Sequence, residues 1–141
     1  MENGPARNGI YLAAPLFSDA ERNYNLLLRD FLVANGYQVY LPQETGDGLA
    51  GPERDRVIFR SHVQALGRAS CVVGVCDGAD TDSGTAWEMG YAAAKGIPVI
   101  ALSTDRRGPW AGRKANLMIR ESAELAGTAE EVLAAIGKRR P

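Results

Sequence analysis

The sequence predicts an α/β fold, namely a flavodoxin-like doubly wound sheet of five parallel strands in the order 2-1-3-4-5 with helices on both faces. Short apolar segments alternate along the chain with segments whose apolar residues recur at helical spacing. The most continuously apolar segment, CVVGVC at residues 71–76, is typical of a central strand that is buried on both faces of a parallel sheet. Right-handed crossovers between such strands then give the doubly wound order.

The first strand and the first helix have clear boundaries in the sequence. The segment GIYLAAP at residues 9–15 is short, apolar and closed by proline, as expected of a buried strand. Ser18 and Glu21 have the spacing of a capping box, which predicts a helix that Gly36 ends. A second strand is expected at residues 37–41.

The remaining elements continue this alternation. Residues 42–52 are rich in turn formers and predict a long connection of the kind that often carries function. Residues 53–69 predict a helix whose inward-facing apolar side chains are Val57, Ile58, Val63 and Leu66. After the central strand we expect a helix capped by Ser83 and ended by Gly96, a strand at residues 97–102, a polar loop at 103–115, a short strand at 123–125 and a last helix begun by Thr128 and Glu131.

Length and composition indicate one small domain without a nucleic-acid or membrane partner. The chain has 141 residues, 45% hydrophobic and 23% charged, which suits a single core at residues 9–141 behind a flexible tail at residues 1–8. Sixteen basic and seventeen acidic residues nearly cancel, and no apolar run has the length of a membrane span. Cys71 and Cys76 should face opposite sides of one strand, so neither a disulfide nor a zinc site is expected, and a cytoplasmic location fits best.

Acidic residues follow the central strand at the edge of the sheet where ligands bind. In a doubly wound sheet the ligand crevice lies where the strand order reverses, here between the first and third strands. Residues 77–88 (DGADTDSGTAWE) place Asp82 just before a helix and Glu88 in its second turn, so both carboxylates border one pocket. Two carboxylates suit glycosyl transfer, in which one attacks the sugar's anomeric carbon. Tyr11, at the end of the first strand, is placed to hydrogen-bond Glu88.

Small residues surround Glu88 and predict that its helix packs close to the sheet, which would hold the carboxylate firmly. These residues are Gly84, Ala86, Gly90 and Ala92–Ala94.

Each candidate residue also has a purely structural interpretation. Acids near a helix N-terminus are stabilised by the helix dipole without any activity. Tyr11 alone fits a half-buried strand tyrosine, and His62, the single histidine, lies on the inward face of its helix, where a core role is the default. The segment after the first strand, AAPLFSD, contains no glycine, which argues against a dinucleotide or a nucleoside triphosphate as the main ligand.

Three segments, in order between Ile10 and about Arg120, resemble the nucleoside 2-deoxyribosyltransferase family. They are IYLAAPLF at residues 10–17, DSGTAWEMGYA at residues 82–92, and NLM at residues 116–118. The second is similar to the family's D-x-G-x-x-x-E-x-G-Y-A stretch and is the most specific of the three. The resemblance implies transfer of 2-deoxyribose between the nucleobases of 2′-deoxyribonucleosides, with side hydrolysis and with no metal or organic cofactor.

The resemblance also implies a role for each matched residue. Glu88 falls on the nucleophile that forms a covalent deoxyribosyl ester, Tyr11 on the hydroxyl that holds it, and Asp82 on the acid that binds the 5′ end of the sugar. Asn116 and Met118 fall on residues that a neighbouring subunit contributes, which implies a homodimer or a higher homo-oligomer with shared sites.

Three further residues are candidates for contact with the substrate. His62 stands where several bacterial members carry an acidic residue that contacts the base, so the base preference of this chain is open. The loop at residues 42–48 has no clear counterpart of their base-binding glutamine, and Gln43 is the candidate for that role. Phe17 closes the first matched segment.

Two rival interpretations remain at the level of sequence. The sister family of 2′-deoxynucleoside 5′-monophosphate N-hydrolases shares the fold and the glutamate but places a phosphate-binding serine where this chain has Asp82. A carboxylate facing a phosphate is unfavourable, so the free nucleoside is favoured. A non-catalytic nucleoside- or nucleotide-binding module on the same fold is the second rival, because fold alone does not determine function.

Overall fold

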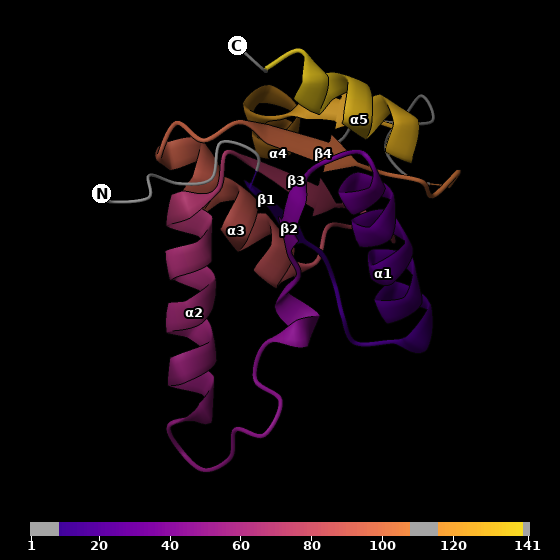
Figure 1. The fold of residues 1–141 in the computed structure, drawn as a ribbon. Coiled ribbons are helices and arrows are strands. Elements are labelled where there is room, and N and C mark those ends of the chain that lie inside the picture. The colour runs from indigo at the N-terminus through magenta and orange to yellow at the C-terminus, as the bar shows by residue number, and fades with distance from the viewer. Residues whose placement is uncertain (1–8, 108–115, 140–141) are drawn as a thin grey trace.

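A computed structural model describes residues 9–107 and 116–139 of the chain. Its five strands form one all-parallel sheet in the order β2-β1-β3-β4-β5, which confirms the predicted α/β fold (Figure 1). The strands are β1 (Gly9–Ala13), β2 (Gln38–Tyr40), β3 (Cys71–Val75), β4 (Val99–Leu102) and β5 (Glu124–Ala126). The helices are α1 (Asp19–Ala34), α2 (Arg54–Arg68), α3 (Ser83–Ala94), α4 (Leu117–Ser122) and α5 (Ala129–Gly137), with a short 3-10 helix, η1 (Pro42–Glu44), after β2.

Helices cover both faces of the sheet. One apolar cluster joins the sheet to α1 and α5 through Leu28, Leu32, Val132 and Ile136, among others. The other joins it to α2, α3 and α4 through side chains that include Leu66, Met89 and Ile119. Figure 1 shows α1 and α2 on opposite sides of the sheet, as this division requires.

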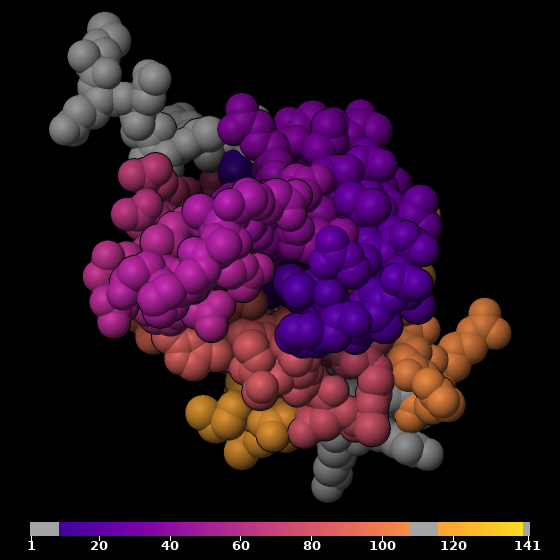
Figure 2. Space-filling model, turned by 90° about the horizontal axis from the view of Figure 1, so that it is seen from below, coloured from indigo at the N-terminus to yellow at the C-terminus, as the bar shows by residue number. Residues whose placement is uncertain are grey.

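Alternation along β1 determines which side chains can reach the site. Ile10 and Leu12 belong to the cluster beneath α1 and α5, whereas Tyr11 and Ala13 face α2 and α3. The strand pairs with β2 on one side and with β3 on the other, so it lies at the predicted reversal of strand order. Figure 2 looks onto the face where the indigo segment before α1, the magenta α2 and the salmon α3 meet.

The two cysteines occupy opposite faces of the sheet, as their spacing predicts. Cys71 belongs to the cluster beneath α1 and α5, and Cys76 to the cluster beneath α2 and α3. Both are free and buried, and burial raises the pKa of the Cys71 thiol to about 12 and that of Cys76 to about 11. Their thiols are therefore protonated and inert at neutral pH.

The helix starts are mostly as predicted. Ser18 and Glu21 form the expected capping box, and Thr128 caps α5 by accepting from the Glu131 amide. One expectation was wrong: Asp82, not Ser83, caps α3, because its longer carboxylate reaches the Thr85 amide while Ser83 is already the first helical residue.

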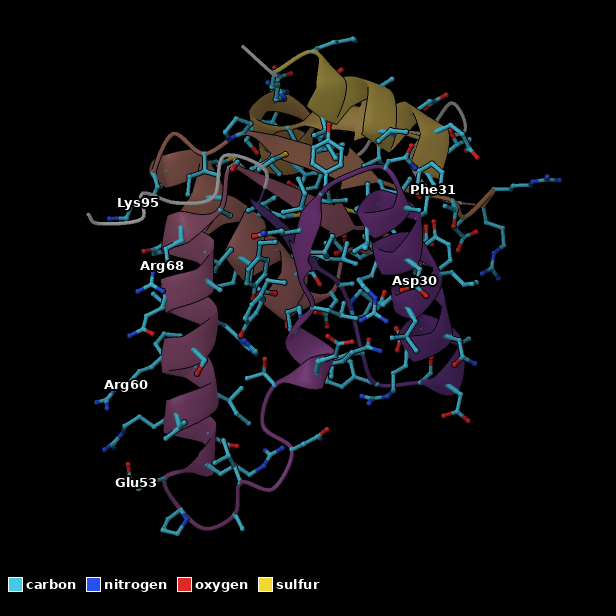
Figure 3. All side chains as sticks on the ribbon, in the orientation of Figure 1. Asp30, Phe31, Glu53, Arg60, Arg68 and Lys95 are labelled. Atoms are coloured by element: carbon cyan, nitrogen blue, oxygen red, sulfur yellow. The ribbon has the colours of Figure 1, made fainter. Side chains whose placement is uncertain are left out.

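One packing expectation was also wrong. Val57 is exposed, because Ile58 and His62, rather than Val57, form the inward face of α2 near its start. Figure 3 shows Arg60 and Arg68 of the same helix pointing away from the molecule.

The close contact between α3 and the sheet involves a small residue of the helix, the fully buried Ala92, and a glycine of the strand beneath it. Gly84 and Gly90 of α3 are exposed. Gly74 of β3 lies against the buried side chain of Met89, and a Cβ added there would stand 2.3 Å from the Met89 sulfur. This glycine lets Met89 lie flat on the strand one residue beyond Glu88.

The predicted tail at residues 1–8 and most of the predicted loop at 103–115 lie outside the described residues. In the described part of the chain, no helix is both long and apolar enough to span a membrane.

Candidate active site

Glu88 and Tyr11 meet at the carboxyl edge of the sheet. Glu88 projects from the second turn of α3, and the fully buried Tyr11 projects from β1 toward the same side. The Tyr11 hydroxyl donates a hydrogen bond to Oε2 of Glu88, as the sequence predicts. The contact joins residues 77 positions apart and holds the carboxylate in one orientation.

The environment of Glu88 shifts its titration toward neutral pH. Burial is the largest cause and raises the pKa of Glu88 to about 7; the hydrogen bond from Tyr11 lowers it, and the charge of Asp82 raises it. Burial and the adjacent carboxylate raise the pKa of Tyr11, so its hydroxyl stays protonated and remains a donor. A carboxylate that is partly desolvated yet held by one donor is more nucleophilic than one fully solvated in water.

Asp82 lies at the N-terminus of the helix that carries Glu88. Its Oδ2 accepts hydrogen bonds from the Thr85 amide at 3.0 Å and from the Thr85 hydroxyl at 3.1 Å. Within the described part of the chain, Oδ1 accepts no hydrogen bond. The capping contact therefore fixes the direction of the carboxylate and leaves one oxygen for a ligand.

A group that the sequence did not reveal lies behind Tyr11. Tyr40 of β2 is the register partner of Tyr11, and the two rings stack with centroids 5.2 Å apart and planes 17° apart. The Tyr40 hydroxyl lies 3.0 Å from Nδ1 of His62 and 3.0 Å from the hydroxyl of Thr45. His62 is half-buried, and burial lowers its pKa, so the ring is neutral at neutral pH.

Gln43 lies in η1, and its side-chain amide is engaged at both ends. Its Oε1 accepts from the buried Asn25 at 2.9 Å, and its Nε2 donates to the Arg22 carbonyl at 3.1 Å. Asn25 also donates to the Pro15 carbonyl at 2.9 Å and so joins the end of the first matched segment to η1. Sequence reasoning missed Asn25, although a polar residue on the inward face of an amphipathic helix is the signal that marks it.

Asp77, the first acid of the 77–88 segment, has a structural partner in the described chain. It accepts from the amide and the hydroxyl of Thr104, both at 2.6 Å, and from the amide of Asp105 at 3.0 Å. These contacts hold the segment after β4 against the segment after β3. Asp77 thus has a structural role that its contacts with Thr104 and Asp105 explain.

The remaining candidates lie exposed on the surface of the chain. Phe17 is 77% exposed and precedes α1. Asn116 caps α4 through its side chain, which accepts from the Met118 amide at 2.9 Å, and Met118 is 74% exposed. The structure therefore brings Tyr11, Asp82 and Glu88 to one edge of the sheet and connects His62 to them through Tyr40. It leaves Phe17, Asn116 and Met118 at the surface.

Nothing in residues 9–107 and 116–139 forms a cluster of three or more histidine, cysteine or acidic side chains that would hold a metal ion. The groups present at the carboxyl edge of the sheet are a buried carboxylate, a tyrosine hydroxyl that donates to it and a second acid. Paired acids at a ligand-binding edge are typical of enzymes that act on glycosidic bonds.

Comparison with protein families identifies the chain more closely. The family model of nucleoside 2-deoxyribosyltransferase matches residues 10–118. The chain belongs to this family and is an enzyme that acts on nucleosides and nucleobases, by deoxyribosyl transfer or by a related N-glycosidase reaction. A search of curated proteins gives no match.

Solved structures agree with this assignment. The 2-deoxyribosyltransferase of Bacillus psychrosaccharolyticus is 26% identical over 88% of this chain and 89% of its own, with a TM-score of 0.78. A conserved protein of Enterococcus faecalis V583 is 28% identical over 94% of this chain and 99% of its own, with a TM-score of 0.76. The 2-desoxiribosyltransferase of Leishmania mexicana, 19% identical over 95% and 99%, shares the fold with a TM-score of 0.73.

Proposed function

We propose that this enzyme transfers 2-deoxyribose between nucleobases in two steps, with Glu88 as the nucleophile. A carboxylate oxygen of Glu88 attacks C1′ of a 2′-deoxyribonucleoside, and the C1′–N bond breaks as its electron pair leaves with the base. A nitrogen of a second base then attacks C1′ and releases the carboxylate. Water in place of that base gives hydrolysis, and the two inversions at C1′ give overall retention.

One observation carries this proposal: the buried Glu88 is held by the hydroxyl of Tyr11 at the reversal of strand order. A solvated surface acid needs no such partner. Within the described part of the chain, no lysine or arginine lies within ion-pair distance of Glu88.

Asp82 supports a free nucleoside as the substrate rather than a nucleoside 5′-monophosphate. Its capping contact with Thr85 fixes a carboxylate at the N-terminus of α3, where one oxygen is open to accept a hydrogen bond from a 5′-hydroxyl. A 5′-phosphate at the same place would meet a like charge in a partly buried site. A wild type that prefers monophosphates over nucleosides would overturn this choice.

We further propose that two subunits share each site, with Asn116 and Met118 of one chain completing the site of its neighbour. The exposure of both residues supports this arrangement. Large apolar side chains that would ordinarily be buried are also exposed on the same side of the sheet; they are Phe59, Trp87, Leu117 and Met118. Exposed apolar surface of this kind is typical of an interface between subunits.

A base-exchange assay tests the transfer reaction. Incubation of the wild type with deoxyinosine and free adenine is expected to yield deoxyadenosine and hypoxanthine, and chromatography measures both products. Glu88→Gln should fold normally and lose more than about 99% of this activity, because a neutral amide cannot form the ester. A 2-fluoro-2-deoxy nucleoside should add one sugar mass to the wild-type peptide that contains Glu88. Labelling of another peptide, or an active Glu88→Gln protein, would contradict the assignment.

A further inference from the structure

A chain of three polar groups connects the segment after β2 with α2 beside the catalytic pair. The Tyr40 hydroxyl lies 3.0 Å from the Thr45 hydroxyl and 3.0 Å from Nδ1 of His62. The ring of Tyr40 stacks on that of Tyr11, whose hydroxyl holds Glu88. His62 is therefore separated from the attacking carboxylate by two stacked rings.

The two hydroxyl groups permit two arrangements of protons along this chain. In the first, Thr45 donates to Tyr40 and Tyr40 donates to Nδ1 of His62, so Nε2 carries the ring proton and is a donor. In the second, Nδ1 donates to Tyr40 and Tyr40 donates to Thr45, so Nε2 carries no proton and is an acceptor. The change from the first arrangement to the second moves the ring proton from Nε2 to Nδ1 by exchange with water and rotates the two hydroxyl groups. Tyr40 and Nδ1 stay hydrogen-bonded in both arrangements, and the proton of the partly exposed Thr45 hydroxyl turns from Tyr40 to water.

The free ring nitrogen is available to a ligand. In the described part of the chain Nε2 of His62 makes no hydrogen bond, and Nδ1 is already engaged by Tyr40. The imidazole is half-buried on the face of α2 that packs against Tyr40. Burial lowers its pKa, which keeps the ring in the neutral form that has two tautomers.

We propose that Thr45 and Tyr40 set the tautomer of His62, and that His62 selects the nucleobase through Nε2. This inference rests on the proposed function. The donor tautomer matches a base with a carbonyl at the position that Nε2 meets, such as a 6-oxopurine. The acceptor tautomer matches a base with an amino group there, such as a 6-aminopurine. An imidazole in this relay serves both kinds of base, which an ionised carboxylate cannot do because it only accepts.

Thr45→Val separates the two arrangements. Without the threonine oxygen, the Tyr40 hydroxyl has one acceptor left, Nδ1 of His62, so the donor tautomer is favoured. The acceptor tautomer would leave the proton of the half-buried Tyr40 hydroxyl without an acceptor. Thr45→Ser keeps the oxygen and should behave as the wild type. Ser61→Ala is a matched control, because it removes a hydroxyl beside His62 that donates to the Val57 carbonyl instead.

Nitrogen NMR reads the tautomer directly, since His62 is the single histidine of the chain. With ¹⁵N-labelled protein free of substrate at neutral pH, wild type, Thr45→Ser and Ser61→Ala are expected to show averaged shifts for the two ring nitrogens. Thr45→Val is expected to show a protonated Nε2 and an unprotonated Nδ1. A wild type already confined to one tautomer, or a Thr45→Val spectrum like that of the wild type, overturns the relay.

Competition between two substrates measures the selectivity of the enzyme for the nucleobase. The ratio of kcat/KM for deoxyinosine to that for deoxyadenosine should rise about three- to tenfold in Thr45→Val, the effect of one hydrogen bond to the base, and stay unchanged in Thr45→Ser. A tautomer shift without a change in this ratio overturns the role in base selection. If the wild type cleaves neither nucleoside, the proposed function fails, while the NMR result still decides whether the relay sets the tautomer.

Discussion

Glu88 is the residue whose protonation should control the rate. Its pKa is raised to about 7, chiefly by burial, and the ionised carboxylate alone can attack C1′. We therefore expect kcat/KM to rise about tenfold per pH unit well below 7 and to level off above it. The measurement is a pH profile of base exchange under substrate-limiting conditions.

Two variants should move the midpoint of that profile in opposite directions. Tyr11→Phe removes the hydrogen bond that lowers the pKa of Glu88, so its midpoint should lie at higher pH than that of the wild type. Asp82→Asn removes a charge that raises this pKa, so its midpoint should lie at lower pH. Midpoints that both move in the same direction would show that another group controls the profile.

The sequence predicted the residues of the site whose partners follow from strand order. Tyr11 lies in β1 and Glu88 in the helix that follows the neighbouring strand β3, so their meeting followed from the predicted reversal of order. Tyr40 was not predicted as part of the site, because its place depends on the register of β2, an element of three residues. The contact of Asn25 with Gln43 depends on side-chain rotamers across 18 residues, which periodicity does not encode.

At the scale of the element, the position of α3 depends on Gly74 in the strand beneath it. A Cβ at this position would stand 2.3 Å from Sδ and 2.8 Å from Cγ of Met89, whose side chain is buried and already contacts the Cys76 sulfur at 3.9 Å. We expect Gly74→Ala to lower the free energy of unfolding by about 1–3 kcal/mol, because the core must shift to admit one carbon. Urea denaturation gives this value.

Two further variants identify the cause of that loss. Combining Gly74→Ala with Met89→Val should cost less than the sum of the single substitutions, because the smaller side chain makes room for the added carbon. Gly67→Ala is the matched control: Gly67 lies in α2 with nothing within 4 Å of an added Cβ, so this change should be neutral or stabilising. Additive losses in the double variant would indicate strain elsewhere than at Met89.

At the scale of the whole molecule, the strand order was predictable because each apolar segment is separated from the next by an amphipathic one, and right-handed crossovers leave few topologies. The distribution of exposed apolar side chains was not predictable. Trp87 stacks on Tyr91 and meets Phe59 edge to face, yet Trp87 and Phe59 remain about half exposed. Helical spacing shows that a face is apolar, but it does not show whether that face packs within the same chain or stays exposed on its surface.

Subunit mixing tests whether Asn116 completes the neighbouring site. Glu88→Ala and Asn116→Ala proteins should each be nearly inactive alone, since every site in either protein lacks one group. After subunit exchange, half of the dimers pair one variant with the other, so that one of their two sites carries both changes and the other carries none. Random pairing should then restore roughly a quarter of wild-type activity, as two-fold symmetry dictates. A mixture that stays inactive despite exchange proven by mass spectrometry would place Asn116 in its own subunit's site or outside any site.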